Sequence, residues 1–112
     1  MCMITADGLI EINKKFDNGN LVNKSSLEFA ISSTYKTKDW VKQLSYIVRA
    51  ILIDHVFEEG NKRTAAALVF YFFEAYQVAY DPYKVDKIIA EITFKNISNI
   101  EHIRRKLKDA IR

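Results

Sequence analysis

The segment NKRTAAALVFYFFEAY, residues 61–76, contains the longest uninterrupted apolar run of the chain, from Ala65 to Phe73. This run is about half as long as a membrane-spanning helix requires. In a helix built from the segment, apolar side chains fall on nearly every side, which is typical of a helix inside a protein core. The segment therefore predicts a central buried helix that begins at Asn61, in a protein without a membrane anchor.

Both neighbours of this segment also have the pattern of helices. Upstream, apolar residues recur every three or four positions over residues 40–52, and Asp39 can cap the helix that they form. We expect this helix to run into His55 and to stop near Gly60. Downstream, Asp81-Pro82 predicts a new helix with aspartate as the cap and proline in its first turn.

The rest of the chain predicts three shorter helices. One covers residues 7–16 and is followed by a turn at residues 17–20; residues 32–38 are polar and predict a loop. Capping boxes are expected from Ser25 to Glu28 and from Ser98 to Glu101. No stretch alternates as a strand does, and no repeat or low-complexity linker occurs. We therefore expect an all-α fold of about six helices in a single domain over residues 1–112.

Composition indicates an ordinary globular protein, with 49% hydrophobic and 28% charged residues. The single cysteine, Cys2, has no internal disulfide partner, which favours a cytoplasmic protein. The net charge of +3 is too small to indicate nucleic-acid binding. The basic residues Arg104-Arg105-Lys106, Lys108 and Arg112 are interpreted as a solvated helix face, with a surface for a partner or a nucleic acid as the alternative.

Gly60 and Asn61 lie at the junction where the most apolar helix starts. The first backbone N–H groups of a helix have no partner within it and carry the positive end of its dipole. Glycine permits the backbone angles that let such groups converge on an anion. Lys62 and Arg63 add two cations at the same place, so the segment predicts a phosphate-binding site.

The residues just before this junction suit the same ligand. The Glu59 carboxylate could hold a Mg²⁺ ion that bridges phosphate oxygens. His55, expected on the end of the preceding helix, could accept a proton from an incoming hydroxyl group. Phe57 is expected to face inward and to anchor the segment. Taken alone, His55 and Glu59 could also be an ordinary surface pair, and a zinc site is disfavoured because the chain has only one other histidine, His102, and one cysteine.

The segment His55-x-Phe57-x-Glu59-Gly60-Asn61-Lys62-Arg63 resembles the signature of the Fic/Doc family, H-x-F-x-[D/E]-[G/A]-N-[G/K]-R. The resemblance implies that His55 is the general base and that Glu59 binds the Mg²⁺ accompanying ATP or another nucleoside triphosphate. It also implies that Gly60, Asn61 and Lys62 form the anion nest, that Arg63 pairs with a phosphate and that Phe57 is structural.

Two positions bear on which reaction the resemblance implies. Family members that transfer AMP usually carry glycine in place of Lys62 and a second arginine in place of Ala66. Lysine without a second arginine is the Doc-like pattern, which implies transfer of the γ-phosphoryl group from ATP to a protein hydroxyl. Gly60, where Doc itself tends to have alanine, keeps AMP transfer (adenylylation) open. The missing arginine also leaves open a non-catalytic phosphate-binding or nucleotide-binding module.

The resemblance also carries expectations about partners. Doc-type toxins act on elongation factor Tu, which makes that protein the expected substrate. The inhibitory pattern [S/T]-x-x-x-E-[G/N] of many relatives is not found here, so a separate antitoxin is expected as in toxin–antitoxin pairs. Tyr35, Lys36 and Lys38 lie in the loop where relatives place a flap that holds the target chain, although an ordinary solvated loop is an equal interpretation.

Overall fold

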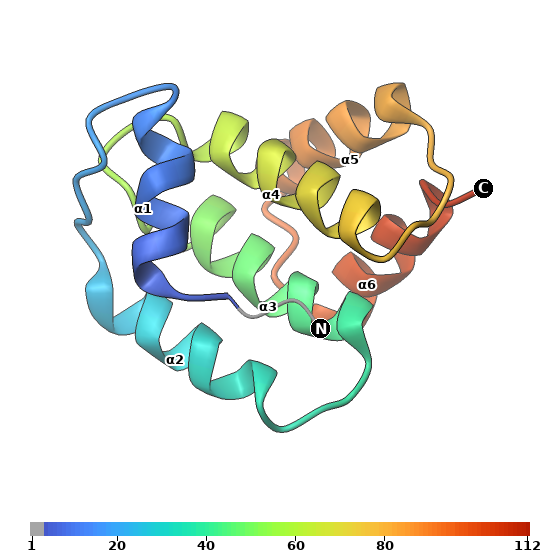
Figure 1. Ribbon diagram of the computed structural model, residues 1–112, viewed down its shortest axis with the longest axis horizontal. Coiled ribbons are helices and arrows are strands. Elements are labelled where there is room, and N and C mark those ends of the chain that lie inside the picture. The colour runs from blue at the N-terminus through green and yellow to red at the C-terminus, as the bar shows by residue number, and fades with distance from the viewer. Residues whose placement is uncertain (1–3) are drawn as a thin grey trace.

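The computed structural model describes residues 4–112, which fold into six α-helices (Figure 1). Cys2, for which no internal disulfide partner is expected, lies outside the described residues. The helices are α1 (Ala6–Lys14), α2 (Lys24–Thr34), α3 (Trp40–Leu52), α4 (Asn61–Ala75), α5 (Pro82–Lys95) and α6 (Ile100–Asp109). The described part of the chain contains only two isolated β-bridges outside these helices, which confirms the expected all-α domain.

The hydrophobic core is built around two helices, α3 and α4. Figure 1 shows them side by side, with α1 and α2 on one flank and α5 and α6 on the other. Helix α3 contacts α2, α4, α5 and α6, whereas α4 contacts α1, α3 and α5. The predicted central helix thus shares the centre with its predecessor. No helix within residues 4–112 is long and apolar enough to cross a bilayer.

Aromatic contacts join α3 to the C-terminal end of α4. Trp40 stacks on Tyr76 with a ring-centroid distance of 4.3 Å, and it meets the edge of Phe73 at 6.1 Å. Both geometries are favourable for aromatic rings. The aromatic residues of the α4 segment are therefore mainly packing residues, with Tyr71 as the exposed exception.

The helix starts confirm two of the predicted caps and correct two others. The carboxylate of Asp39 accepts from the N–H groups of Val41 and Lys42, and that of Asp81 accepts from Tyr83. The predicted capping boxes at Ser25 and Ser98 are wrong, because Asn23 and Asn99 are the capping residues. Asparagine caps a helix at least as well as serine, and each asparagine lies within two residues of the serine that was expected.

Helix α2 continues into the residues that were expected to form a loop. The hydroxyl groups of Ser33 and Thr34 donate to the carbonyl oxygens of Phe29 and Ile31, at 2.9 and 2.6 Å. Bonding back to the preceding turn lets polar residues extend a helix. Helix α1, in contrast, ends at Lys14, two residues before its predicted end.

Helix α3 ends at Leu52, so the expectation that it runs through His55 to Gly60 is wrong. Residues 53–60 form a loop instead, in which His55 has a positive φ of 51°. The chain leaves the helix because Val56 and Phe57 turn into the core, where both are 0% exposed. His55 therefore belongs to the loop and not to the end of a helix.

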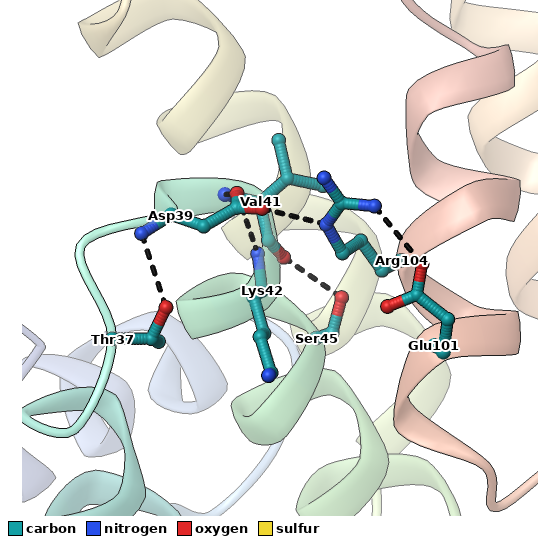
Figure 2. A network of polar contacts seen from close by, with 7 residues as sticks. All are labelled: Thr37, Asp39, Val41, Lys42, Ser45, Glu101 and Arg104. Carbon is teal, nitrogen blue, oxygen red and sulfur yellow. Dashed lines mark hydrogen bonds and ion pairs between the residues drawn. The ribbon is translucent and has the colours of Figure 1, made fainter.

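An ion-pair network links the start of α3 to α6 (Figure 2). Arg104 donates to the Asp39 carboxylate at 2.6 Å and to that of Glu101 at 3.0 Å. Partial burial by itself raises the pKa of Asp39. The hydrogen bonds from Arg104 and from the N–H groups of Val41 and Lys42 lower this pKa, as does the Arg104 charge. The pKa of Asp39 therefore lies below its ordinary value of 3.8. Half-buried Arg104 is thus a structural residue, and the predicted solvated basic face does not include it.

We predict that Asp39 stabilises the protein in two separable ways. Asp39→Ala removes the cap and the ion pair and is expected to cost about 1 kcal/mol or more. Asp39→Asn keeps a capping oxygen but removes the charge that Arg104 pairs with. The pKa of Asp39 is lowered on folding, so the ion-pair contribution is complete above about pH 3.8 and is lost as the pH falls below it.

Urea denaturation between pH 3 and pH 7 measures both contributions. The free energy of unfolding of Asp39→Asn should fall less steeply with acidification than that of the wild type. Parallel curves for the two proteins would contradict a role for the Asp39 charge.

Candidate functional site

The loop that follows α3 is held by backbone pairing to the segment that follows α1. Val22 and Asn23 donate their N–H groups to the carbonyl oxygen of Val56, at 2.8 and 3.2 Å, and the N–H of Glu58 donates to Asn20 at 3.0 Å. These bonds flank an antiparallel bridge between Leu21 and Phe57. Figure 1 shows the two loops side by side at one end of the molecule. The pairing gives residues 56–58 a defined path although they belong to no helix.

Asparagine side chains complete the attachment of this loop. The Asn23 amide donates to the carbonyl oxygen of Asp54 at 2.9 Å, and the Asn20 amide donates to the Glu58 carboxylate at 3.2 Å. The hydroxyl of Ser26 also donates to the carboxylate of Asp54. Residues 20–26 thus hold the backbone on both sides of His55.

The predicted anchor, Phe57, is buried at 0% exposure, as expected. Asn61 clamps it from the first turn of α4: its side-chain amide donates to the Phe57 carbonyl at 2.9 Å and its oxygen accepts from the Phe57 N–H at 3.1 Å. Both polar functions of the Asn61 side chain are therefore occupied. Only its backbone N–H is left to serve the predicted anion nest.

Gly60 precedes α4 in the left-handed conformation, with φ 75° and ψ 16°. It is the N-cap residue, and no side chain among the described residues caps this helix. The first intrahelical bond runs from the N–H of Thr64 to the Gly60 carbonyl, at 2.9 Å. The N–H groups of residues 61–63 have no partner within the helix, and this arrangement favours an anion at the helix N-terminus.

Asn13 of α1, a residue that the sequence did not reveal as important, supports the glycine from behind. Its amide donates to the carbonyl oxygen of Glu59 and to the hydroxyl of Thr64, both at 2.9 Å. Its oxygen accepts from the N–H of Gly19 at 2.9 Å. The Asn13 side chain is fully buried, and it therefore ties both loops to the start of α4.

One pocket of about 460 Å³ brings together all six predicted site residues. Its volume lies in the range of small-molecule sites. The pocket is lined by His55, Glu59, Gly60, Asn61, Lys62, Arg63, Asp17, Leu52 and Thr93. The last three residues were not predicted. Asp17 lies in the loop after α1, Leu52 ends α3 and Thr93 belongs to α5.

Two cations, Lys62 and Arg63, and two carboxylates, Asp17 and Glu59, line the pocket. Lys62 and Arg63 are exposed, and neither forms an ion pair with another residue in the part of the chain that the structure describes. Cations in the first turn of a helix are unfavourable because they meet the positive end of the dipole. An anion in the pocket would relieve this repulsion.

His55 is exposed at the rim of the pocket, and its ring forms no hydrogen bond to any of residues 4–112. Asn23, which bonds the carbonyl of Asp54, fixes the backbone next to it. The loop therefore places the imidazole at the pocket but leaves the orientation of the ring free. A base oriented by a third group, as in catalytic triads, is not present in this arrangement.

The carboxylates at the pocket suit a magnesium ion only together with a ligand. Within residues 4–112, no group of three or more histidine, cysteine, aspartate or glutamate residues is placed to hold a metal. Glu59 and Asp17 are the two carboxylates that line the pocket. Mg²⁺ commonly binds through one or two carboxylates, with phosphate oxygens and water completing its shell. The residues present thus fit an ion that enters with a phosphate ligand.

The loop with Tyr35, Lys36 and Lys38 lies away from the pocket. It precedes α3, whereas His55 follows that helix, and the 13 residues of α3 span about 20 Å. Tyr35, Lys36 and Lys38 therefore do not line the pocket, and the target-holding loop and the ordinary solvated loop both stay interpretations. Residues 18–23 are the segment that lies next to the His55 loop.

Comparison of the chain with protein-family models, with curated proteins and with solved structures finds no match. A function for the pocket therefore has to be inferred from its residues and their geometry.

We predict that Asn13 is the main polar support of the site. Asn13→Ala leaves the Gly19 N–H and the Glu59 carbonyl without their partner, which should cost about 2–3 kcal/mol. Asn18→Ala is the matched control, because Asn18 is exposed and its side chain accepts one hydrogen bond from the Asn20 backbone. Urea denaturation measures the free energy of unfolding. Equal losses in the two variants would contradict the role given to Asn13.

We also predict that Gly60 cannot be replaced by alanine without strain. Its φ is positive, and a Cβ atom would lie 3.1 Å from the Asn13 amide nitrogen and 3.2 Å from the Asp17 Cβ. Gly60→Ala should therefore destabilise the protein by about 1–2 kcal/mol. It should also weaken the binding of inorganic tripolyphosphate, measured by calorimetry, because the start of α4 must shift.

Gly19→Ala is the control for the backbone contribution. Gly19 has nearly the same φ of 74°, but its added Cβ would meet the flexible side chain of Lys14. This variant should lose stability without losing affinity for tripolyphosphate. A loss of affinity in Gly19→Ala but not in Gly60→Ala would show that the start of α4 is not the anion site.

Proposed function

We propose that this protein is an enzyme that transfers a phosphoryl group from ATP to a hydroxyl group of a protein. The observation that carries the proposal is the convergence of His55, Glu59 and residues 60–63 on one pocket at the uncapped start of α4. Each of these residue types supplies a part that phosphoryl transfer needs. The resemblance of the same segment to the Fic/Doc signature supports this function.

The phosphate chain of ATP would bind at the start of α4. Backbone N–H groups, the helix dipole and the unpaired charges of Lys62 and Arg63 all favour negative charge there. Charge that develops on the phosphate oxygens during transfer would be stabilised by the same groups. Arg63, with a planar guanidinium, is suited to bind two phosphate oxygens at once.

His55 would act on the incoming hydroxyl group. An imidazole nitrogen accepts the hydroxyl proton while the oxygen forms a bond to the γ-phosphorus, and the bond from that phosphorus to the bridging oxygen breaks to release ADP. Glu59, with phosphate oxygens, would hold a Mg²⁺ ion that neutralises part of the phosphate charge. The free ring of His55 would be oriented only when a target hydroxyl meets it.

Transfer of AMP is the alternative reaction at the same site. Its main requirement in the related signature is a second arginine, and this position is Ala66 here. Ala66 lines a groove of about 200 Å³ together with Lys62, Arg63 and three residues of α5. Beyond Lys62 and Arg63, the residues that line this groove add no cation and include the carboxylate of Asp86, so we favour phosphoryl transfer.

A second candidate function is a non-catalytic nucleotide-binding module. It is favoured by His55, whose ring has no orienting partner among residues 4–112. In such a module, Arg63 would still be required for binding and His55 would not.

The resemblance also suggests the biological setting. We propose elongation factor Tu as the first protein substrate to test and a separate antitoxin as the regulator. The proposed reaction would take place in the cytoplasm, where both ATP and this substrate occur.

We predict that incubation with ATP, Mg²⁺ and elongation factor Tu, or with a bacterial lysate, adds about 80 Da to a target protein, the mass of one phosphoryl group. Intact-mass spectrometry measures the product. His55→Ala should abolish the modification because the general base is lost, while it should bind ATP as the wild type does.

Arg63→Ala is the matched variant, which should lose ATP binding and the modification together. A His55-dependent gain of an adenylyl group would replace phosphoryl transfer with AMP transfer. ATP binding that depends on Arg63, with no modification of any lysate protein, would favour the non-catalytic module.

A further inference from the structure

Phe94 of α5 is the most exposed large hydrophobic side chain among the described residues, at 90%. Single exposed apolar residues are common on protein surfaces and need no function by themselves. The position of Phe94 is what distinguishes it. The residue directly before it, Thr93, lines the pocket at the start of α4.

Phe94 also lies next to the groove that adjoins this pocket. Ala90, one helical turn before Phe94, lines that groove opposite Lys62 and Arg63. Residues four positions apart lie on the same face of a helix, and helical side chains lean toward the N-terminus of their helix. Phe94 itself lines neither the pocket nor the groove. It is the exposed residue that directly follows the α5 residues that do, so it lies at their C-terminal edge.

The two sides of this space have complementary chemistry. The start of α4 offers N–H groups and two cations, which suit a chain of phosphates. On α5, Asp86, Ile89 and Ala90 line the groove, and beyond Ala90 the exposed ring of Phe94 offers a flat apolar surface, which suits the face of an aromatic ring. A nucleoside triphosphate carries both a polyanionic chain and a flat base.

We propose that Phe94 is the stacking surface for the base of a nucleoside triphosphate whose phosphates bind at the start of α4. This inference rests on the proposed function and names how that site recognises its nucleotide. A phenyl ring contacts the face of a base and not its hydrogen-bonding edge, and every base has such a face. The site is therefore specific for nucleoside triphosphates as a class and selects weakly among the bases.

Tyr83 provides a matched control on the same helix. It is 86% exposed, and the 11 residues that separate it from Phe94 bring it back to nearly the same face of α5. It lies about 16 Å farther along the helix axis, beyond the residues that line the pocket and the groove. Replacing either side chain by alanine removes an exposed aromatic ring without opening the core.

The experiment is calorimetric titration of the full chain with MgATP and, separately, with inorganic tripolyphosphate. Phe94→Ala should weaken ATP binding about tenfold or more, the effect expected for one lost base–aromatic stack. Its affinity for tripolyphosphate should not change. Tyr83→Ala should bind both ligands as the wild type does, and Phe94→Trp should bind ATP at least as tightly. GTP and CTP should bind within about tenfold of ATP.

Three outcomes would overturn the proposal, and they differ in what they say of the proposed function. If Phe94→Ala binds ATP normally while Arg63→Ala loses both ligands, the phosphate site stands and the stacking surface does not. If Phe94→Ala weakens ATP and tripolyphosphate equally, Phe94 acts on the phosphate site and not on the base. If the wild type binds neither ligand, the proposed function fails together with this inference.

Discussion

The hydrogen bonds of Asn13 are the interaction on which the candidate site depends. This buried side chain contacts the loop after α1, the loop after α3 and the first turn of α4 at once. Apolar packing against α4 places α1, but it does not determine how the two loops meet, because apolar contacts have little directionality. The three hydrogen bonds of Asn13 determine how the loops meet, because each requires a donor and an acceptor in a particular geometry. The left-handed Gly60 backbone is held between them.

Two groups of basic residues illustrate how the structure divides its charges. Arg104 and Lys106 of α6 are half-buried and pair with Asp39, Glu101 and Glu91, so they connect helices. Lys62 and Arg63 are exposed at the helix end where cations are least stable, and residues 4–112 supply no ion-pair partner for them. The first group serves the fold. The second has a structural cost, which a bound phosphate chain would offset.

The pocket also combines a rigid side with an adjustable one. Asn61 and Asn13 hold the start of α4 through four hydrogen bonds of 2.9 to 3.1 Å, so this side of the pocket is formed before any ligand arrives. On the other side, the His55 ring is exposed and forms no hydrogen bond to any of residues 4–112, so its orientation is not fixed. A preformed site lowers the entropic cost of binding. In the proposed function, the imidazole of His55 would make its contacts only when a hydroxyl group is present.

Local patterns were enough to predict the helices and most of the pocket. Apolar spacing located α3 to α6, Asp39 and Asp81 marked two helix starts, and six residues between His55 and Arg63 line the pocket as expected. Each of these signals arises within about one helical turn, where residues interact through the helix itself. The end of α3 at Leu52, the positive φ of His55 and the contribution of Asp17 and Thr93 depend instead on packing between distant segments. Asn13 is the clearest case: its partners Glu59 and Thr64 are 46 and 51 residues away, and its position four residues after Leu9 resembled an ordinary place on an apolar stripe. No periodicity along one helix can indicate such a bond, because it forms only when two helices and two loops come together.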